Sequence, residues 1–316
     1  MEGFMAVSTA TRTSTLLERR LLPGLALSAL ISTVLLVLMG SIVRVTGNGL
    51  GCPDWPLCYG RAIPPALTGA WMEFTHRMIG GLTSLQIVLL GWLAWRGYRT
   101  ERWIFRPATA AVALLVVQIV LGGLHVILEI PPATGLVHTG VAMLIVGLIA
   151  VVVAVAMPAA QRLRRAGGEL FHNARFVSWV SWTTAATYFL LLTGSYVTRR
   201  GASLACPSFP WCGSNAPGIH ALIQLQMLHR YTAFSVAFLT LVTIAWLLSR
   251  RKEDRRVRRF AYGLGVLLIA QFGLGIANVL LRLPMWSRAL HLTVGATFWA
   301  SLVVLWTTVW LARGED

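Results

Sequence analysis

Long runs of apolar residues alternate with short polar stretches along nearly the whole chain. They predict eight membrane-spanning helices, at about residues 21–45, 70–95, 106–129, 134–157, 174–198, 220–248, 259–282 and 286–311. Each run approaches or exceeds the ~20 residues that a helix needs to cross a bilayer. Charged residues make up only 12% of the chain, about half of the share usual in soluble domains. The pattern predicts an all-α polytopic membrane protein.

The basic residues give the orientation of these spans. The formal net charge is +16, but the basic side chains cluster in the connections, which argues against nucleic-acid binding. Nineteen lysines and arginines fall in the N-terminal segment, in the connections that follow the second, fourth and sixth predicted spans, and at the C-terminus. Six fall at the opposite ends of the spans. Because positive segments stay in the cytoplasm, we expect a multi-pass protein of the cell membrane with both termini cytoplasmic.

The second half of the chain repeats polar positions of the first. Positions before the second span recur 154 residues later: Gly40-Ser41, Cys52-Pro53 and Cys58 as Gly194-Ser195, Cys206-Pro207 and Cys212. Later positions recur 153 residues on: His76-Arg77, Gln118, Pro131 and His138 as His229-Arg230, Gln271, Pro284 and His291. Each half holds four spans, so both halves share one orientation, as parallel repeats do. We predict two tandem four-helix bundles related by a pseudo-twofold axis, residues 1–160 and 161–316, linked by a basic loop near 161–169.

Four histidines fall on the repeat. His76 and His138 begin the second and fourth predicted spans on the outer side, and His229 and His291 do the same in the second half. Two imidazoles at matched depth on different helices of one bundle suit axial ligation of haem iron. Hydrogen-bonded core histidines are the alternative for either pair. A zinc site is disfavoured, because no third ligand recurs in both halves.

Polar neighbours of these histidines differ between the halves. Glu73 precedes His76 by one helical turn, whereas Gln226 precedes His229. A carboxylate there can relay protons or stabilise positive charge, or it can simply pair with Arg77. The chemistry is therefore expected in the first half and a standing redox cofactor in the second. Arg77 suits a haem carboxylate, or else it reaches the lipid headgroups.

The cysteines lie in two copies of one outer loop. Cys52 and Cys58 enclose five residues, as do Cys206 and Cys212. On the oxidising side of the membrane, disulfides within each loop are expected. They can be structural or redox-active, and a zinc site built from all four thiolates is a third, less favoured alternative.

The chain resembles the haem A synthase family, and its cysteine-bearing subgroup in particular. The resemblance rests on the segment from Arg44 to Pro56, on Glu73-Phe74-Thr75-His76-Arg77, on His138-Thr139-Gly140, and on His229-Arg230 with His291. It implies oxidation of the C8 methyl group of haem O to a formyl group by successive hydroxylations, giving haem A for terminal oxidases. It implies substrate haem near His76 and His138, essential Glu73, and haem b ligated by His229 and His291.

Other partners and functions follow less directly. The resemblance implies haem O synthase and assembly factors of the terminal oxidase as partners, besides membrane lipid. A quinol is one candidate electron donor, and a homo-oligomer is compatible with the sequence. A dihaem b-type electron-transfer protein would have similar histidines but would not need Glu73 in one half only. A transporter is disfavoured, because polar residues gather at the outer ends of the spans and not at the midplane. His125, whose repeat position is Asn278, has no assigned role.

Overall fold

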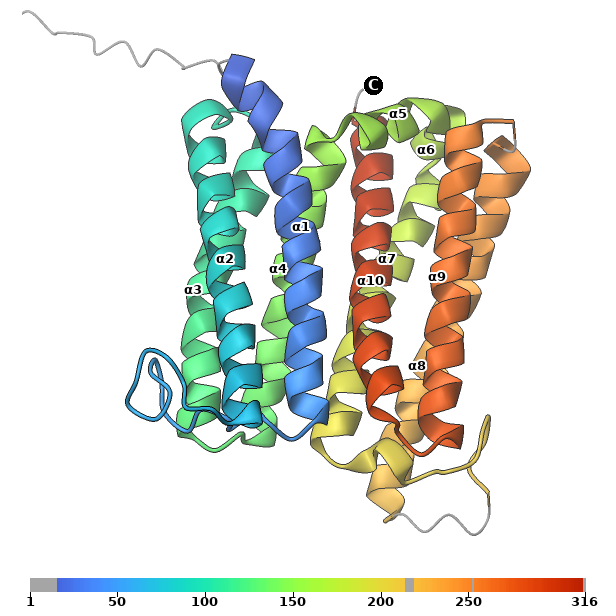
Figure 1. Ribbon diagram of the computed structural model, residues 1–316. Helices are drawn as coiled ribbons and strands as arrows, with labels where there is room; N and C mark the ends of the chain where they lie inside the picture. Colours follow the sequence, from blue (N-terminus) through green and yellow to red (C-terminus); the bar gives the residue numbers. More distant parts are fainter. Residues whose placement is uncertain (1–15, 214–218, 252, 315–316) are drawn as a thin grey trace, which may run out of the picture.

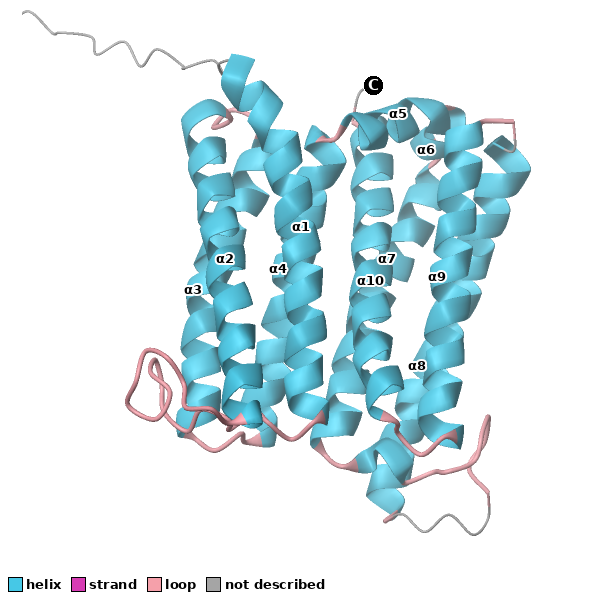
Figure 2. Ribbon diagram, in the orientation of Figure 1, coloured by secondary structure: helices cyan, strands magenta, loops and turns pink. Residues whose placement is uncertain are grey.

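The computed structural model describes residues 16–213, 219–251 and 253–314, and within these ranges it is helical with no strand (Figures 1 and 2). The helices of the first half are α1 (Leu16–Val45), α2 (Thr68–Gly97), α3 (Arg102–Ile127) and α4 (Pro132–Ala156). Those of the second are α7 (Ala174–Arg199), η1 (Ala202–Leu204), α8 (His220–Arg251), α9 (Arg255–Leu280) and α10 (Met285–Arg313). The predicted all-α class is confirmed.

Seven helices are long and apolar enough to cross a membrane, counted over the described part of the chain: α1, α2, α3, α4, α8, α9 and α10. The predicted fifth span is also a helix, α7, of 26 residues, but its serines and threonines make it less apolar. Several of its hydroxyl groups donate to the carbonyl four residues earlier, as Thr184 does to Val180 and Thr187 to Thr183, both at 2.8 Å. These polar groups are thus satisfied inside the helix.

The long helices lie roughly side by side (Figure 1). Contacts run in a cycle through α1, α2, α3 and α4, and in a second cycle through α7, α8, α9 and α10, with α4 and α10 touching between them. At this seam, the buried Trp299 of α10 packs on Gly147 of α4, where an added Cβ would lie 3.1 Å from the indole. The Trp299 indole N–H also donates to the Met143 carbonyl at 2.8 Å.

The repeat is visible in the backbone of two connections. Between α3 and α4, Glu129 and Ile130 both have positive φ, and between α9 and α10 Arg282 and Leu283 do the same. Left-handed conformations are uncommon for such residues. The Ile130 N–H donates to the His125 carbonyl and the Leu283 N–H to that of Asn278, both at 2.8 Å. The same turn therefore leads into α4 and α10.

The link between the halves differs from the predicted loop. It forms α5 (Pro158–Gly167) and the short α6 (Glu169–His172). Its arginines give a basic face, while Ala160, Leu163 and Ala166 on the other face are buried. Helix α5 is too short to show as an apolar run. Both helices lie at the end of the molecule that holds the C-terminus, opposite the two cysteine loops (Figure 1).

Candidate functional site

In the first half, α2 carries Glu73, His76 and Arg77 on successive positions of one face. Glu73 is buried, with 6% of its surface exposed, and its Oε1 lies 3.2 Å from Nε of Arg77. His76 lies against Gly40 of α1, where an added Cβ would come within 2.9 Å of the imidazole Cε1. Only glycine at this position lets the ring seat so close to the α1 backbone.

The second histidine of this half, His138 on α4, is held from α3. The Gln118 side-chain nitrogen lies 3.1 Å from His138 Nε2, and Gly122 lies beside the ring, where an added Cβ would be 3.5 Å from Cε1. His125 stacks on His138, with ring centroids 6.2 Å apart and planes 9° apart. His138 also lies within electrostatic range of His76, so the structure brings the predicted pair together.

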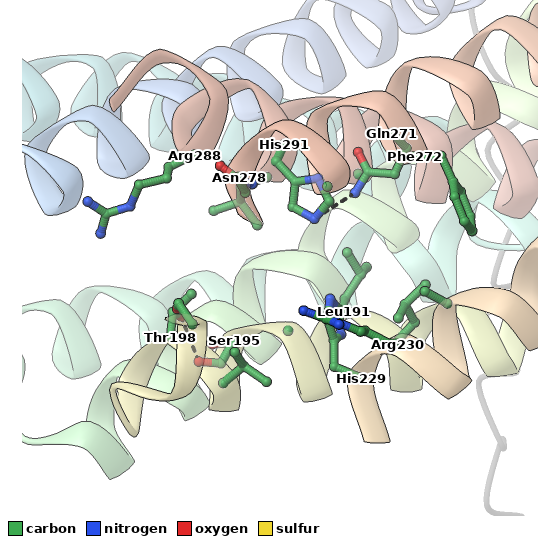
Figure 3. A pocket seen from close by; sticks show the side chains of 18 of the residues that line it. Leu191, Ser195, Thr198, His229, Arg230, Gln271, Phe272, Asn278, Arg288 and His291 are labelled. Atoms are coloured by element: carbon green, nitrogen blue, oxygen red, sulfur yellow. Dashed lines mark hydrogen bonds between the residues drawn. The ribbon is translucent and has the colours of Figure 1, made fainter. Parts of the chain in front are cut away.

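The second half reproduces this arrangement around a cavity (Figure 3). An added Cβ at Gly194 would lie 2.9 Å from Cε1 of His229, and one at Gly275 would lie 3.3 Å from that of His291. Gln271 reaches His291 Nε2 at 3.4 Å. The two imidazoles line one cavity whose other walls are largely apolar, formed by Leu190, Leu191, Phe234, Leu268, Phe272 and Phe298.

The ring nitrogens of the four histidines differ in their hydrogen-bond partners, and these partners decide which lone pairs are available to a metal ion. An amide nitrogen only donates, so Nε2 of His138 and of His291 accepts from its glutamine. Nδ1 of these rings, like that of His76, is buried without a hydrogen-bond partner among the described residues. His229 differs: the Thr193 hydroxyl donates to the Leu190 carbonyl and so accepts from His229 Nδ1 at 3.1 Å. This leaves the His229 Nε2 lone pair for a metal ion.

The cysteine loops are pinned to the helices beside these histidines. The structure pairs Cys52 with Cys58 and Cys206 with Cys212, as predicted, which excludes a four-thiolate zinc site. No cluster of three or more His, Cys, Asp or Glu suited to a metal occurs in the described residues.

Arg77 and Arg230 connect each loop to its helix. Arg77 donates to the carbonyls of Leu57 at 2.8 Å and Cys52 at 3.3 Å. Arg230 donates to Ser208 and Cys206, both at 2.7 Å. The N–H groups of Arg77 are therefore already bonded to the loop and to Glu73, and a haem carboxylate would have to compete with these partners.

Glu73 and Gln226 occupy equivalent positions but make different contacts. Gln226 accepts from the Cys206 backbone N–H at 2.6 Å and donates to the Ser203 carbonyl at 2.8 Å, so both ends of its amide hold the loop. Glu73 has its ion pair with Arg77. The first half thus keeps an ionisable group where the second half has a purely structural one.

The chain matches a family model over residues 24–71 and 66–303. That model, COX15-CtaA, is described as cytochrome oxidase assembly protein. The chain belongs to this family.

Curated relatives agree with the membership in the COX15-CtaA family. A heme A synthase of Alkalihalophilus pseudofirmus is 28% identical over 79% of this chain and 84% of its own length. One of Bacillus cereus is 28% identical over 73% and 72%. One of Shouchella clausii is 27% identical over 79% and 84%.

Some contacts of this COX15-CtaA family member were not predicted from its sequence. The four glycines that seat the imidazoles form repeat pairs, Gly40 with Gly194 and Gly122 with Gly275. The sequence signal for these glycines is their spacing, which matches the offset of the repeat. Gln118 and Gln271 are repeat positions in the sequence, but the sequence does not indicate that they lie beside His138 and His291. Of the remaining histidines, His220 bonds to Gln224 within α8 at 2.9 Å.

Proposed function

We propose that this chain is a haem A synthase, which oxidises the C8 methyl group of haem O to a formyl group by successive hydroxylations. Its relatives carry that name. The observation that carries the proposal is the combination of two repeat-related histidine pairs with one unmatched carboxylate, Glu73. Such an arrangement suits two haems in one chain, of which one is changed and one is kept.

In this proposal, haem O lies in the first half near His76 and His138. Glu73, one helical turn from His76, holds or moves a proton or steadies positive charge as the methyl carbon is oxidised. Its ion pair with Arg77 fixes the carboxylate beside the Cys52–Cys58 loop. Because Arg77 also donates to that loop, the loop covers and orients this side of the site.

The second half holds haem b between His229 and His291, which supplies electron transfer when bound. The hydrogen bond from His229 Nδ1 to Thr193 supports this assignment, because such a bond fixes the orientation of a ligand ring. In the first half, the α1 residue equivalent to Thr193 is Met39, and Nδ1 of His76 has no such hydrogen bond within the described residues. A firmly oriented ring suits a cofactor that stays, and a less restrained one suits a substrate that must leave.

The proposal includes the membrane arrangement. Helix α7 is the fifth span and brings the total to eight, because its hydroxyl groups are satisfied internally and it packs against α4, α8 and α10. The two cycles of helices are then two four-helix bundles, residues 1–160 and 161–316, with the termini cytoplasmic and the cysteine loops outside. Haem O synthase and oxidase assembly factors are the proposed partners. A quinol is a candidate electron donor.

Mass analysis of extracted haem tests the proposal. The chain is expressed in a membrane that supplies haem O, and the haems of that membrane and of the purified protein are separated by chromatography. We expect formyl-bearing haem A, together with haem b retained by the protein. His291→Ala should lose the haem b. Two haems b and no haem A would instead support the dihaem electron-transfer protein, for which Glu73 has no evident use.

A further inference from the structure

Three arginines line one end of the cavity that holds His229 and His291. They are Arg44 of α1, Arg199 of α7 and Arg288 of α10, and all three are half-buried. Arg44 lies within electrostatic range of both other guanidinium groups. Figure 3 shows Arg288 at one end of the labelled residues, beyond His291 on the same helix. Arg44 comes from the first half of the chain, so this end of the cavity is built by both halves.

These three positive charges have no carboxylate partner. Among the ion pairs found within the described residues, such as Arg77 with Glu73 and Arg256 with Asp254, none involves Arg44, Arg199 or Arg288. The sequence contains no aspartate or glutamate at all from 170 to 252 or from 255 to 314. Half-buried cations in mutual repulsion are stabilised when an anion lies among them. The described carboxylates of the second half, Glu169, Glu253 and Asp254, lie on α6 and before α9, at the other end of the helices.

The repeat does not by itself call for these cations. At the repeat-equivalent positions the chain has Thr198 for Arg44, Val45 for Arg199 and Gly135 for Arg288. Two of these equivalent positions belong to the first half and carry no charge of their own, and the guanidinium of Arg199 lies beside Gly135, where it also approaches His125 at 3.5 Å. Arg230 also lines the cavity, but its N–H groups are taken by the carbonyls of the Cys206–Cys212 loop.

We propose that Arg44, Arg199 and Arg288 bind the carboxylates of the haem held between His229 and His291. The inference rests on the proposed function. The cavity runs from ring nitrogens, past apolar walls, to guanidinium groups. That order matches a flat apolar ligand with iron at its centre and carboxylates on one edge. Guanidinium groups bind carboxylates through paired N–H donors. The first half thereby completes the cofactor site of the second half through Arg44.

The test compares haem loss from full-length variants in nanodiscs of neutral lipid and, in parallel, in nanodiscs that contain anionic lipid. Arg44→Gln and Arg288→Gln are combined, while Arg199 is left intact because it also approaches His125 at 3.5 Å. Arg200→Gln is the matched control, since Arg200 is exposed and does not line the cavity. Each protein is loaded with protohaem or with its dimethyl ester, which lacks the carboxylates. The rate of transfer to apomyoglobin is then measured.

We expect the double variant to lose protohaem at least ~10-fold faster than the wild type, because hydrogen bonds to charged groups are lost. Arg200→Gln should match the wild type. With the dimethyl ester, the wild type and the double variant should lose haem at the same rate. This second comparison separates carboxylate binding from a general loss of folding.

Three results would overturn the inference while leaving the haem b site in place. The first is equal loss of protohaem from wild type and double variant. The second is an equally large difference with the ester, which would make the role structural. The third is a difference confined to anionic lipid, which would assign the arginines to headgroup phosphate. A wild type that binds no haem at all would remove the proposed function as well.

Discussion

At the scale of single residues, the contrast between Glu73 and Gln226 is the sharpest difference between the halves. Glu73→Gln gives the first half the residue type that the second half has at the equivalent position, Gln226. It keeps the volume and a hydrogen-bonding head group and removes only the carboxylate. We expect haem A formation to fall roughly 10²–10⁴-fold, as for the loss of a positioned acid or base, with accumulation of haem O or a hydroxylated product. Haem composition is measured by chromatography.

Haem b content is the internal control for that variant. It should be unchanged, because Gln226 already shows that this backbone accepts an amide at the position. A normal yield of haem A from Glu73→Gln would reduce Glu73 to the ion-pair partner of Arg77.

Asp54 gives a pH-dependent prediction in the first cysteine loop. The backbone N–H groups of Gly60 and Tyr59 donate to its carboxylate at 2.7 and 2.6 Å and hold its pKa below the ordinary value of 3.8. A lowered pKa means that the carboxylate stabilises the loop above the pKa of the unfolded chain, and that this contribution is lost as the pH falls through the folded pKa. The amide proton shifts of Tyr59 and Gly60 should titrate together with a midpoint below 3.8. A midpoint at or above that value, or the same titration in Asp54→Asn as in the wild type, would separate the loop from this carboxylate.

At the scale of elements, the glycines Gly40 of α1, Gly194 of α7 and Gly275 of α9 decide how closely an imidazole approaches its neighbouring helix. In Gly194→Ala the new Cβ would lie 2.9 Å from His229 Cε1, so the ring or α7 must move. Overpacking of this kind costs about 1–3 kcal/mol. We expect haem b binding to weaken by roughly tenfold and its low-spin absorption spectrum to change.

The matched control for that substitution is Gly273→Ala on α9. Nothing lies within 4 Å of an added Cβ there, and alanine favours a helix more than glycine does. Its haem b spectrum should be that of the wild type. Equal behaviour of the two variants would show that the close approach of His229 to α7 is not needed.

At the scale of the whole molecule, the proposed orientation predicts which positions a membrane-impermeant maleimide can reach. Ile219 is exposed near the second cysteine loop, with 72% of its surface accessible, and Ala159 is exposed on α5 at the opposite end. Ile219→Cys should be labelled in intact cells, and Ala159→Cys only after lysis. The reverse result would invert the orientation.

Much of this architecture could be predicted from the sequence, because apolar length and the spacing of repeats are one-dimensional signals. The bounds of the long helices, the disulfide pairs and the grouping of His76 with His138 follow from them. The helical link α5 could not, because ten residues with Arg162, Arg164 and Arg165 look like a charged loop. The position of Arg44 in the cavity of the second half depends on the contact between α1 and α10. The spacing of residues within one helix does not predict which helices contact each other.

The seam between α4 and α10 has a consequence for electron flow. Trp299 packs over Gly147 and donates a hydrogen bond to the Met143 carbonyl, so we expect the two histidine pairs to keep a constant separation. Under the proposed function, electrons pass between the halves by tunnelling through an immobile medium. Neither half swings toward the other. The rate of that transfer should therefore be indifferent to solvent viscosity and should respond instead to what fills the space beside Trp299.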